Sequence, residues 1–173
     1  MKTAGFNGIG VDGLAAEAGV TSGAFYSSFR NKEAMLEAIV DAVGAPFLAD
    51  PTTAGKAEAR KQLRKFLDVY LCSDHVVNPA EGCPFPALSA DIARAGVTTR
   101  TAYEQKLSTW AHRIADSLDG RRADRERRAW SILSLMVGAI TIARAMSEPA
   151  TQAAVVNSTR RTAETLMSPT AGQ

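Results

Sequence analysis

Few side chains in this 173-residue sequence could support covalent or metal chemistry. The cysteines and histidines that could bind zinc are Cys72, Cys83, His75 and His112. Their spacing matches no recognised zinc motif, and we interpret both cysteines as reduced, partly buried thiols. The sequence also lacks a nucleophile elbow, a phosphate-binding glycine loop and a metalloprotease motif. We therefore expect a protein that is not an enzyme and that needs neither a metal nor another cofactor.

The most informative stretch of the sequence is residues 10–33, GVDGLAAEAGVTSGAFYSSFRNKE. It reads as a helix, a tight turn, a second helix and the start of a third. Leu14, Ala15 and Ala18 recur at helical spacing and indicate the apolar face of the first helix. Gly19 follows, where a chain that leaves a helix favours a residue without a Cβ atom. The pattern predicts a tight turn at this glycine.

The second helix is expected to begin directly after this turn. Thr21 or Ser22 can cap it by accepting a hydrogen bond from a free N–H group. Phe25 and Phe29 are one helical turn apart, so both would face the same core. This arrangement predicts a helix-turn-helix whose second helix presents its other face to the major groove of DNA. From these residues alone, a plain corner between two helices is the alternative.

A longer string, VTSGAFYSSFRNKEAML, closely resembles the turn, the recognition helix and the start of the following helix in TetR-type regulators. The positions that fit that family's pattern are Val20, Thr21, Gly23, Phe25, Tyr26, Phe29, Lys32, Glu33 and Leu36. The resemblance implies an all-α protein, with a helix-turn-helix DNA-binding domain followed by a helical domain for ligand binding and dimerisation. The expected boundaries are residues 1–46 and 47–173.

The resemblance also assigns roles in DNA binding. Thr21, Tyr26 and Lys32 would contact phosphates, which position the domain without reading the sequence. The expected DNA-binding residues are Thr21, Ser22, Gly23, Ala24, Tyr26, Ser27, Ser28 and Lys32. The base edges would fall to Ser22, Ala24, Ser27 and Ser28. The family often has Lys or Arg near Ser22 and His or Arg at Ser27 or Ser28. We therefore expect weak DNA binding by this chain.

The charge distribution and the short N-terminus also predict weak DNA binding. Residues 1–48 carry three basic and five acidic residues, a net charge of −2, against +4 for the remainder, whereas DNA-binding domains are usually basic. TetR-type domains open with a longer, usually basic helix before the pair that is Gly5-Phe6 here, and only MKTA precedes that pair. We expect a form that is shortened at its N-terminus and in which this first helix is largely missing.

Helical periodicity continues through the rest of the chain, and no strand-like alternation interrupts it. Further helices are expected at about residues 32–43, 56–73, 87–95, 98–118, 123–146 and 150–167, with loops at residues 49–56 and 75–86. No run of 18 apolar residues is present, and the N-terminus lacks the apolar core of a signal peptide. We expect a cytoplasmic protein with no membrane partner.

Residues 132–143, ILSLMVGAITIA, are too uniformly apolar for a helix with one wet face. Such a helix is either central in the core or covered by another subunit. The resemblance favours the second reading, because the last two helices of the family usually pair with their symmetry mates. Gly138 and Ala139 would allow close helix approach in that homodimer. Ordinary core packing is the alternative for each residue.

The second domain is expected to hold a small apolar or amphipathic effector. Its aromatic and aliphatic side chains suit a pocket of this kind. The candidate ligand-binding residues are Phe66, Tyr70, Phe85, Leu88, Tyr103, Leu107, Trp110, Trp130 and Met136.

These observations together imply a ligand-responsive transcriptional regulator, a repressor by the family's usual role. It would act as a homodimer on a pseudo-palindromic operator in double-stranded DNA. The alternative is a DNA-silent dimer that has lost its first helix and keeps only ligand binding or another interaction.

Overall fold

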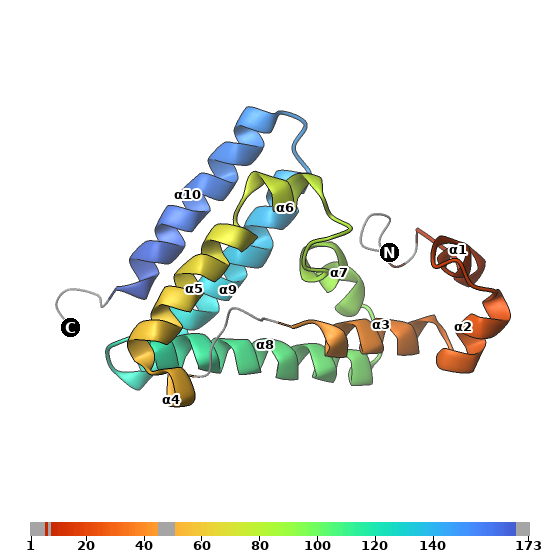
Figure 1. Cartoon of the computed structure of the whole chain (residues 1–173), viewed down its shortest axis with the longest axis horizontal. Coiled ribbons are helices and arrows are strands. Elements are labelled where there is room, and N and C mark those ends of the chain that lie inside the picture. The colour runs from red at the N-terminus through yellow and green to blue at the C-terminus, as the bar shows by residue number, and fades with distance from the viewer. Residues whose placement is uncertain (1–5, 7, 45–50, 169–173) are drawn as a thin grey trace. The chain divides into compact units, whose positions relative to one another are not determined.

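The computed structural model describes residue 6, residues 8–44 and residues 51–168. Within those ranges the chain forms ten helices and no strands, which confirms the expected all-α fold (Figure 1). The expected remnant of the first helix, Met1–Ala4, lies outside the described residues. The helices group into two compact units, which are described separately.

The first unit contains the described residues up to Val43 together with Cys83–Lys106. Its helices are α1 (Val11–Glu17), α2 (Ser22–Ser28), α3 (Lys32–Ala42), α7 (Phe85–Ile92) and the first half of α8 (Val97–Ser117). Side-chain caps fix two of the helix starts. Thr21 Oγ1 accepts a hydrogen bond from the Ala24 N–H at 3.2 Å, and Asn31 Oδ1 accepts one from the Ala34 N–H at 2.8 Å.

Two hydrogen bonds attach α3 to the first half of α8 and to Gly96, the residue just before that helix. Near the start of α3, Glu33 Oε1 accepts from the Gly96 N–H at 2.5 Å. At the other end, Lys106 Nζ donates to the carbonyl oxygen of Asp41 at 2.7 Å. The helix that follows the helix-turn-helix is therefore fixed at both ends to residues far away in the sequence.

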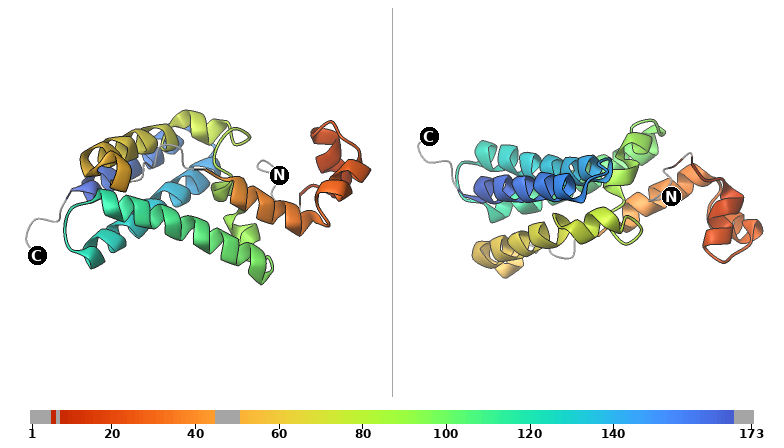
Figure 2. Two further views of the ribbon diagram at one scale, coloured as in Figure 1. Left: turned by 60° about the horizontal axis from the view of Figure 1, so that its bottom comes forward. Right: turned by 90° about the horizontal axis from the view of Figure 1, so that it is seen from above.

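The second unit contains α4 (Pro51–Ala54), α5 (Lys56–Tyr70), α6 (Ser73–Val77), the remainder of α8, α9 (Arg122–Arg144) and α10 (Pro149–Met167). Helix α9 packs along α10, and α10 also contacts α5 and α6 (Figure 2). The shared core is aliphatic and aromatic, with Leu63 and Leu67 from α5 and Ile132, Met136 and Ile140 from α9 all buried. Their three- and four-residue spacing explains why these segments are helical.

A charged side chain closes one end of this unit. Arg128 is only 1% exposed. Its Nε donates to Asp124 Oδ2 at 2.8 Å, and one terminal nitrogen donates to the carbonyls of Leu166 and Ser168 at 3.0 and 3.1 Å. The other terminal nitrogen donates to the carbonyl of Asp119. A single guanidinium thus satisfies carbonyl groups at the ends of α8 and α10, where helices leave acceptors without partners.

The element boundaries differ from the expected ones where the chain turns sharply. Helix α5 ends at Tyr70 because Leu71 leaves the helical conformation, and α6 then occupies the start of the expected loop at residues 75–86. Helix α7 begins at Phe85 rather than residue 87, since Pro86 is well suited to the first turn of a helix. In the expected loop at residues 49–56, the described part includes the short helix α4.

Candidate nucleic-acid interface

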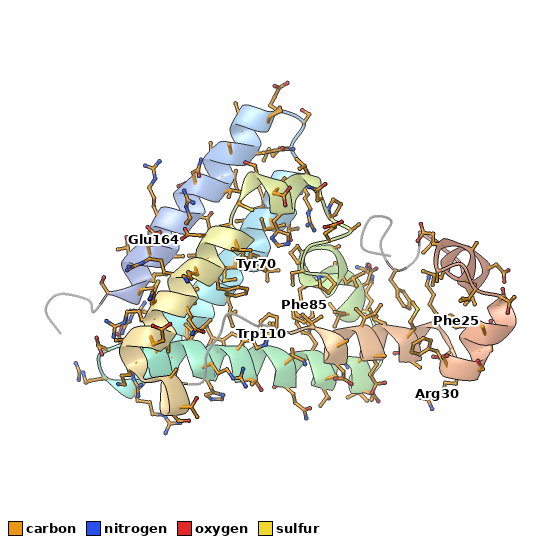
Figure 3. All side chains as sticks on the ribbon, viewed as in Figure 1. Phe25, Arg30, Tyr70, Phe85, Trp110 and Glu164 are labelled. Carbon is orange, nitrogen blue, oxygen red and sulfur yellow. The ribbon has the colours of Figure 1, made fainter. Side chains whose placement is uncertain are left out.

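The corner between α1 and α2 is built around two buried side chains. Ala15 on α1 is almost inaccessible, and so is Phe25 on α2, which Figure 3 labels. Gly19 adopts φ +68°, and the Val20 N–H donates to the Ala15 carbonyl at 2.9 Å. A residue with a Cβ atom is strained in this conformation, so the glycine sets the angle of the turn. The helix-turn-helix geometry predicted for residues 10–33 is therefore present.

The side of α2 opposite Phe25 faces solvent. Gly23, Ala24, Ser27 and Ser28 are exposed. Tyr26 is 58% exposed, although its ring edge contacts Phe25 at a centroid distance of 5.4 Å. Thr21 is also exposed, and Ser22 is half-buried. The structure thus brings seven of the eight expected DNA-binding residues together on or beside one short helix.

The three serine hydroxyl groups of this helix already have partners. Ser22 Oγ donates to Asp12 Oδ1 on α1 at 2.5 Å. Ser27 Oγ and Ser28 Oγ both donate to the carbonyl of Ala24, at 2.8 and 3.3 Å. Asp12 was not among the expected DNA-binding residues, because it precedes the turn and its position suggests only a charge in the first turn of α1.

The eighth residue, Lys32, is engaged within the chain. Its Nζ donates to the carbonyl of Phe6 and lies 4.4 Å from the centroid of the Phe6 ring. The Phe6 N–H in turn donates to Asp91 Oδ2 on α7 at 2.9 Å. The lysine therefore links the start of α3 to Phe6, which lies upstream of α1 in the sequence, in addition to any role toward DNA.

The surface around the corner is not basic. Helices α1 to α3 carry the acidic residues Asp12, Glu17, Glu33, Glu37 and Asp41. The basic residues of this segment are Lys32 and Arg30. The side chain of Arg30 extends into solvent (Figure 3). Attraction to phosphates by the summed charge of this segment is consequently weak.

The candidate ligand-binding residues fall in both units. In the first, Phe85 and Leu88 are buried, and the Tyr103 ring packs on Phe85 at 4.9 Å between centroids. The Tyr103 hydroxyl lies 2.9 Å from Ser89 Oγ, and burial raises the pKa of this phenol above its ordinary value.

In the second unit the candidate residues differ in exposure. Phe66, Tyr70, Trp110 and Met136 are buried, and Leu107 is half-buried. The rings of Phe66 and Tyr70 are in contact, with centroids 5.5 Å apart. Trp130 is 44% exposed on α9, so it lies on the surface of this unit rather than in its core.

An exposed polar helix on a helix-turn-helix corner, followed by a helical unit with an apolar core, is the architecture of a two-part helix-turn-helix protein. Residues 1–39 match the family described as "Bacterial regulatory proteins, tetR family". This match spans α1, α2 and most of α3, so the helix-turn-helix segment is similar to the DNA-binding part of TetR-type regulators.

The fold is shared with a solved structure. The crystal structure of E. coli NemR in its reduced form superposes with a TM-score of 0.72, over 98% of this chain and 92% of that chain. The sequence identity of 18% means that this likeness concerns the fold. Among curated proteins, no sequence matches the chain significantly. Among the described residues, no helix is both long and apolar enough to span a membrane.

Proposed function

We propose that the protein is a cytoplasmic, ligand-responsive repressor that binds a pseudo-palindromic operator as a homodimer. The exposed face of α2, held by the α1–α2 corner, is the observation that supports DNA reading. In sequence order, we assign residues 1–46 to DNA binding and residues 47–173 to effector binding and dimerisation. Effector binding would change the affinity for DNA through a coupling free energy, typically ~1–3 kcal/mol.

An exposed face of α9 supports the homodimer. Trp130, Ser134, Thr141 and Ile142 are exposed along it, and Gly138 between them is half-buried. Ala139 is buried in the core of its own unit, so of the two small residues only Gly138 is available to a second subunit. An exposed tryptophan and isoleucine among small residues suit helix-to-helix packing.

The deciding experiment is selection of duplexes from a randomised DNA pool, followed by gel-shift titration at physiological salt. The proposed function predicts enrichment of a two-fold symmetric site bound by two copies of the chain. The alternative, a DNA-silent dimer, predicts no enrichment although the protein is dimeric in solution. An N-terminally extended form of the gene product, tested in parallel, would show whether a preceding helix strengthens binding.

Replacing Lys32 by alanine tests the expected phosphate contact. DNA affinity should fall about equally for all sequences, and the slope of log K against log salt should decrease by about 1 per subunit. The matched control is Lys61→Ala on α5, which removes the same charge from an exposed position in the second unit. An unchanged salt slope for Lys32→Ala would contradict the phosphate contact. The contact of Lys32 with Phe6 would then be its only role, and a lower melting temperature of the variant would show that role.

The two tryptophans allow effector binding and assembly to be followed separately. Trp110 is 5% exposed, whereas Trp130 is on the exposed face of α9. In Trp130→Phe protein, a bound apolar effector should shift the emission of Trp110 and raise the melting temperature. In Trp110→Phe protein, the emission of Trp130 should instead change when the dimer dissociates on dilution. The effector proposal fails if no apolar compound in a broad panel alters Trp110 emission or the melting temperature.

A further inference from the structure

The serines of α2 share one property that bears on which bases they can read. The hydroxyl hydrogens of Ser27 and Ser28 are directed to the Ala24 carbonyl within the helix. The hydroxyl hydrogen of Ser22 is directed to the Asp12 carboxylate. A hydroxyl that has donated its hydrogen retains only acceptor lone pairs. All three serines therefore present acceptors to their surroundings.

Asp12 extends this pattern beyond α2. Its carboxylate accepts from Ser22 Oγ at 2.5 Å, and an ionised carboxylate can only accept hydrogen bonds. Asp12 is exposed, so its remaining lone pairs are also available at the corner between α1 and α2. Helix α2 contains no lysine, arginine, asparagine or glutamine that would supply a side-chain N–H donor.

We propose that Asp12 is a specificity-determining residue that, with Ser22, selects bases carrying an exocyclic amino group in the major groove. The groups concerned are N4 of cytosine and N6 of adenine. The inference rests on the proposed operator binding and deepens it by stating the chemistry of the half-site.

The physical basis is the donor and acceptor pattern of the base edges. Cytosine and adenine offer amino donors in the major groove, whereas guanine offers only the acceptors N7 and O6. Oxygen lone pairs on Asp12 and Ser22 attract the amino groups and repel the guanine acceptors. Carboxylates in DNA interfaces characteristically accept from cytosine N4. Ala24, exposed beside the serines, adds a methyl group that suits contact with a thymine methyl.

The first test compares the full-length chain with Asp12→Asn and Glu17→Gln in duplex selection. Both substitutions remove one negative charge from α1, but only Asp12 accepts from Ser22. The unmodified chain should disfavour guanine about tenfold at one position of each half-site. Asp12→Asn, which introduces an N–H donor, should reduce that preference to about twofold or reverse it. Glu17→Gln should retain the preference while binding all duplexes more tightly.

The second test uses base analogues in the selected duplex and distinguishes the two sources of the amino group. Replacing cytosine by 2-pyrimidinone removes N4, and replacing adenine by purine removes N6. One of these two replacements should weaken DNA binding by the unmodified chain about tenfold. The same replacement should weaken DNA binding by Asp12→Asn much less. Replacing guanine by 7-deazaguanine on the contacted strand should leave affinity unchanged. Ser22→Ala, which deletes the other half of the pair, should reproduce the loss of preference.

The results separate this inference from the proposed function. If the unmodified chain enriches no sequence, operator binding is wrong and the inference falls with it. If it binds a defined site but Asp12→Asn retains the same base preference with normal melting, only the inference is overturned. A tenfold loss with 7-deazaguanine would equally overturn it, because the corner would then donate to guanine.

Discussion

Arg128→Met is expected to destabilise the second unit by about 3 kcal/mol, which is the scale of breaking a buried charge network. The guanidinium donates to Asp124 and to the carbonyls of Asp119, Leu166 and Ser168, and methionine would leave these acceptors without it. For a chain of this length, the melting temperature should fall by roughly 6–12 °C. Circular dichroism at the helical band measures it directly.

Arg127→Met is the matched control. This neighbouring arginine also binds Asp124, with 2.7 Å between the two groups, but its side chain is 60% exposed. Exposed ion pairs contribute less than about 1 kcal/mol, so the control should melt within a few degrees of the unmodified chain. Equal melting temperatures for the two variants would show that the hydrogen bonds of Arg128 to the ends of α8 and α10 do not stabilise the second unit.

The same two arginines affect the acid response of the protein. Hydrogen bonding by Arg127, followed by the charge of Arg128, holds the pKa of Asp124 below its usual value. A carboxyl whose pKa is depressed by folding stabilises the native state above its ordinary pKa. That contribution is lost as the pH falls through the lowered value in the folded state.

Periodicity was sufficient to predict most of the fold. The long helices α8, α9 and α10 carry apolar residues at three- and four-residue steps, and such patterns specify a helix whatever it packs against. The corner at Gly19 was equally predictable, because a tight turn between two short helices needs a residue that tolerates positive φ. Short helices such as α6 were missed, since five residues are too few to show a period.

The interface was predictable only in part, for a different reason. The exposed residues of α2 follow from its helical register relative to Phe25. The partners of those residues come from elsewhere, as Asp12 does for Ser22 and Phe6 does for Lys32. Sequence spacing does not reveal such pairs, because they depend on how two helices cross. The burial of Arg128 was unpredictable on the same grounds, since its acceptors are backbone carbonyls contributed by distant helix ends.

Exposure along α9 bears on the two readings that the sequence left open, a central core helix or a helix covered by another subunit. The run at residues 132–143 reads as apolar throughout, yet Ser134, Thr141 and Ile142 are exposed while Ile132, Leu133 and Ile140 are buried. The helix is therefore not enclosed on all sides by its own chain. Ile142 is 50% exposed, which is costly for an isolated subunit and favourable where a second one covers it.

Gly138→Arg is expected to convert the proposed dimer into monomers. A Cβ atom at position 138 would meet no other atom within 4 Å, and the glycine has no positive φ. The substitution should therefore leave the subunit folded, and it removes a residue that disfavours helix. Across a helix-to-helix contact, however, the long charged side chain would keep the partner at a distance. Light scattering should give the mass of two subunits for the unmodified chain and of one for Gly138→Arg.

Val69→Arg on α5 is the control, because it adds the same side chain at an exposed apolar position outside the α9 face. It should remain dimeric. Operator affinity should fall about 100-fold or more for Gly138→Arg, since two linked reading heads bind far more tightly than one. Affinity for a single half-site should be unchanged, because the α1–α2 corner belongs to the other unit. A one-subunit mass for the unmodified chain, or a Gly138→Arg protein that stays dimeric, would contradict assembly through this face of α9.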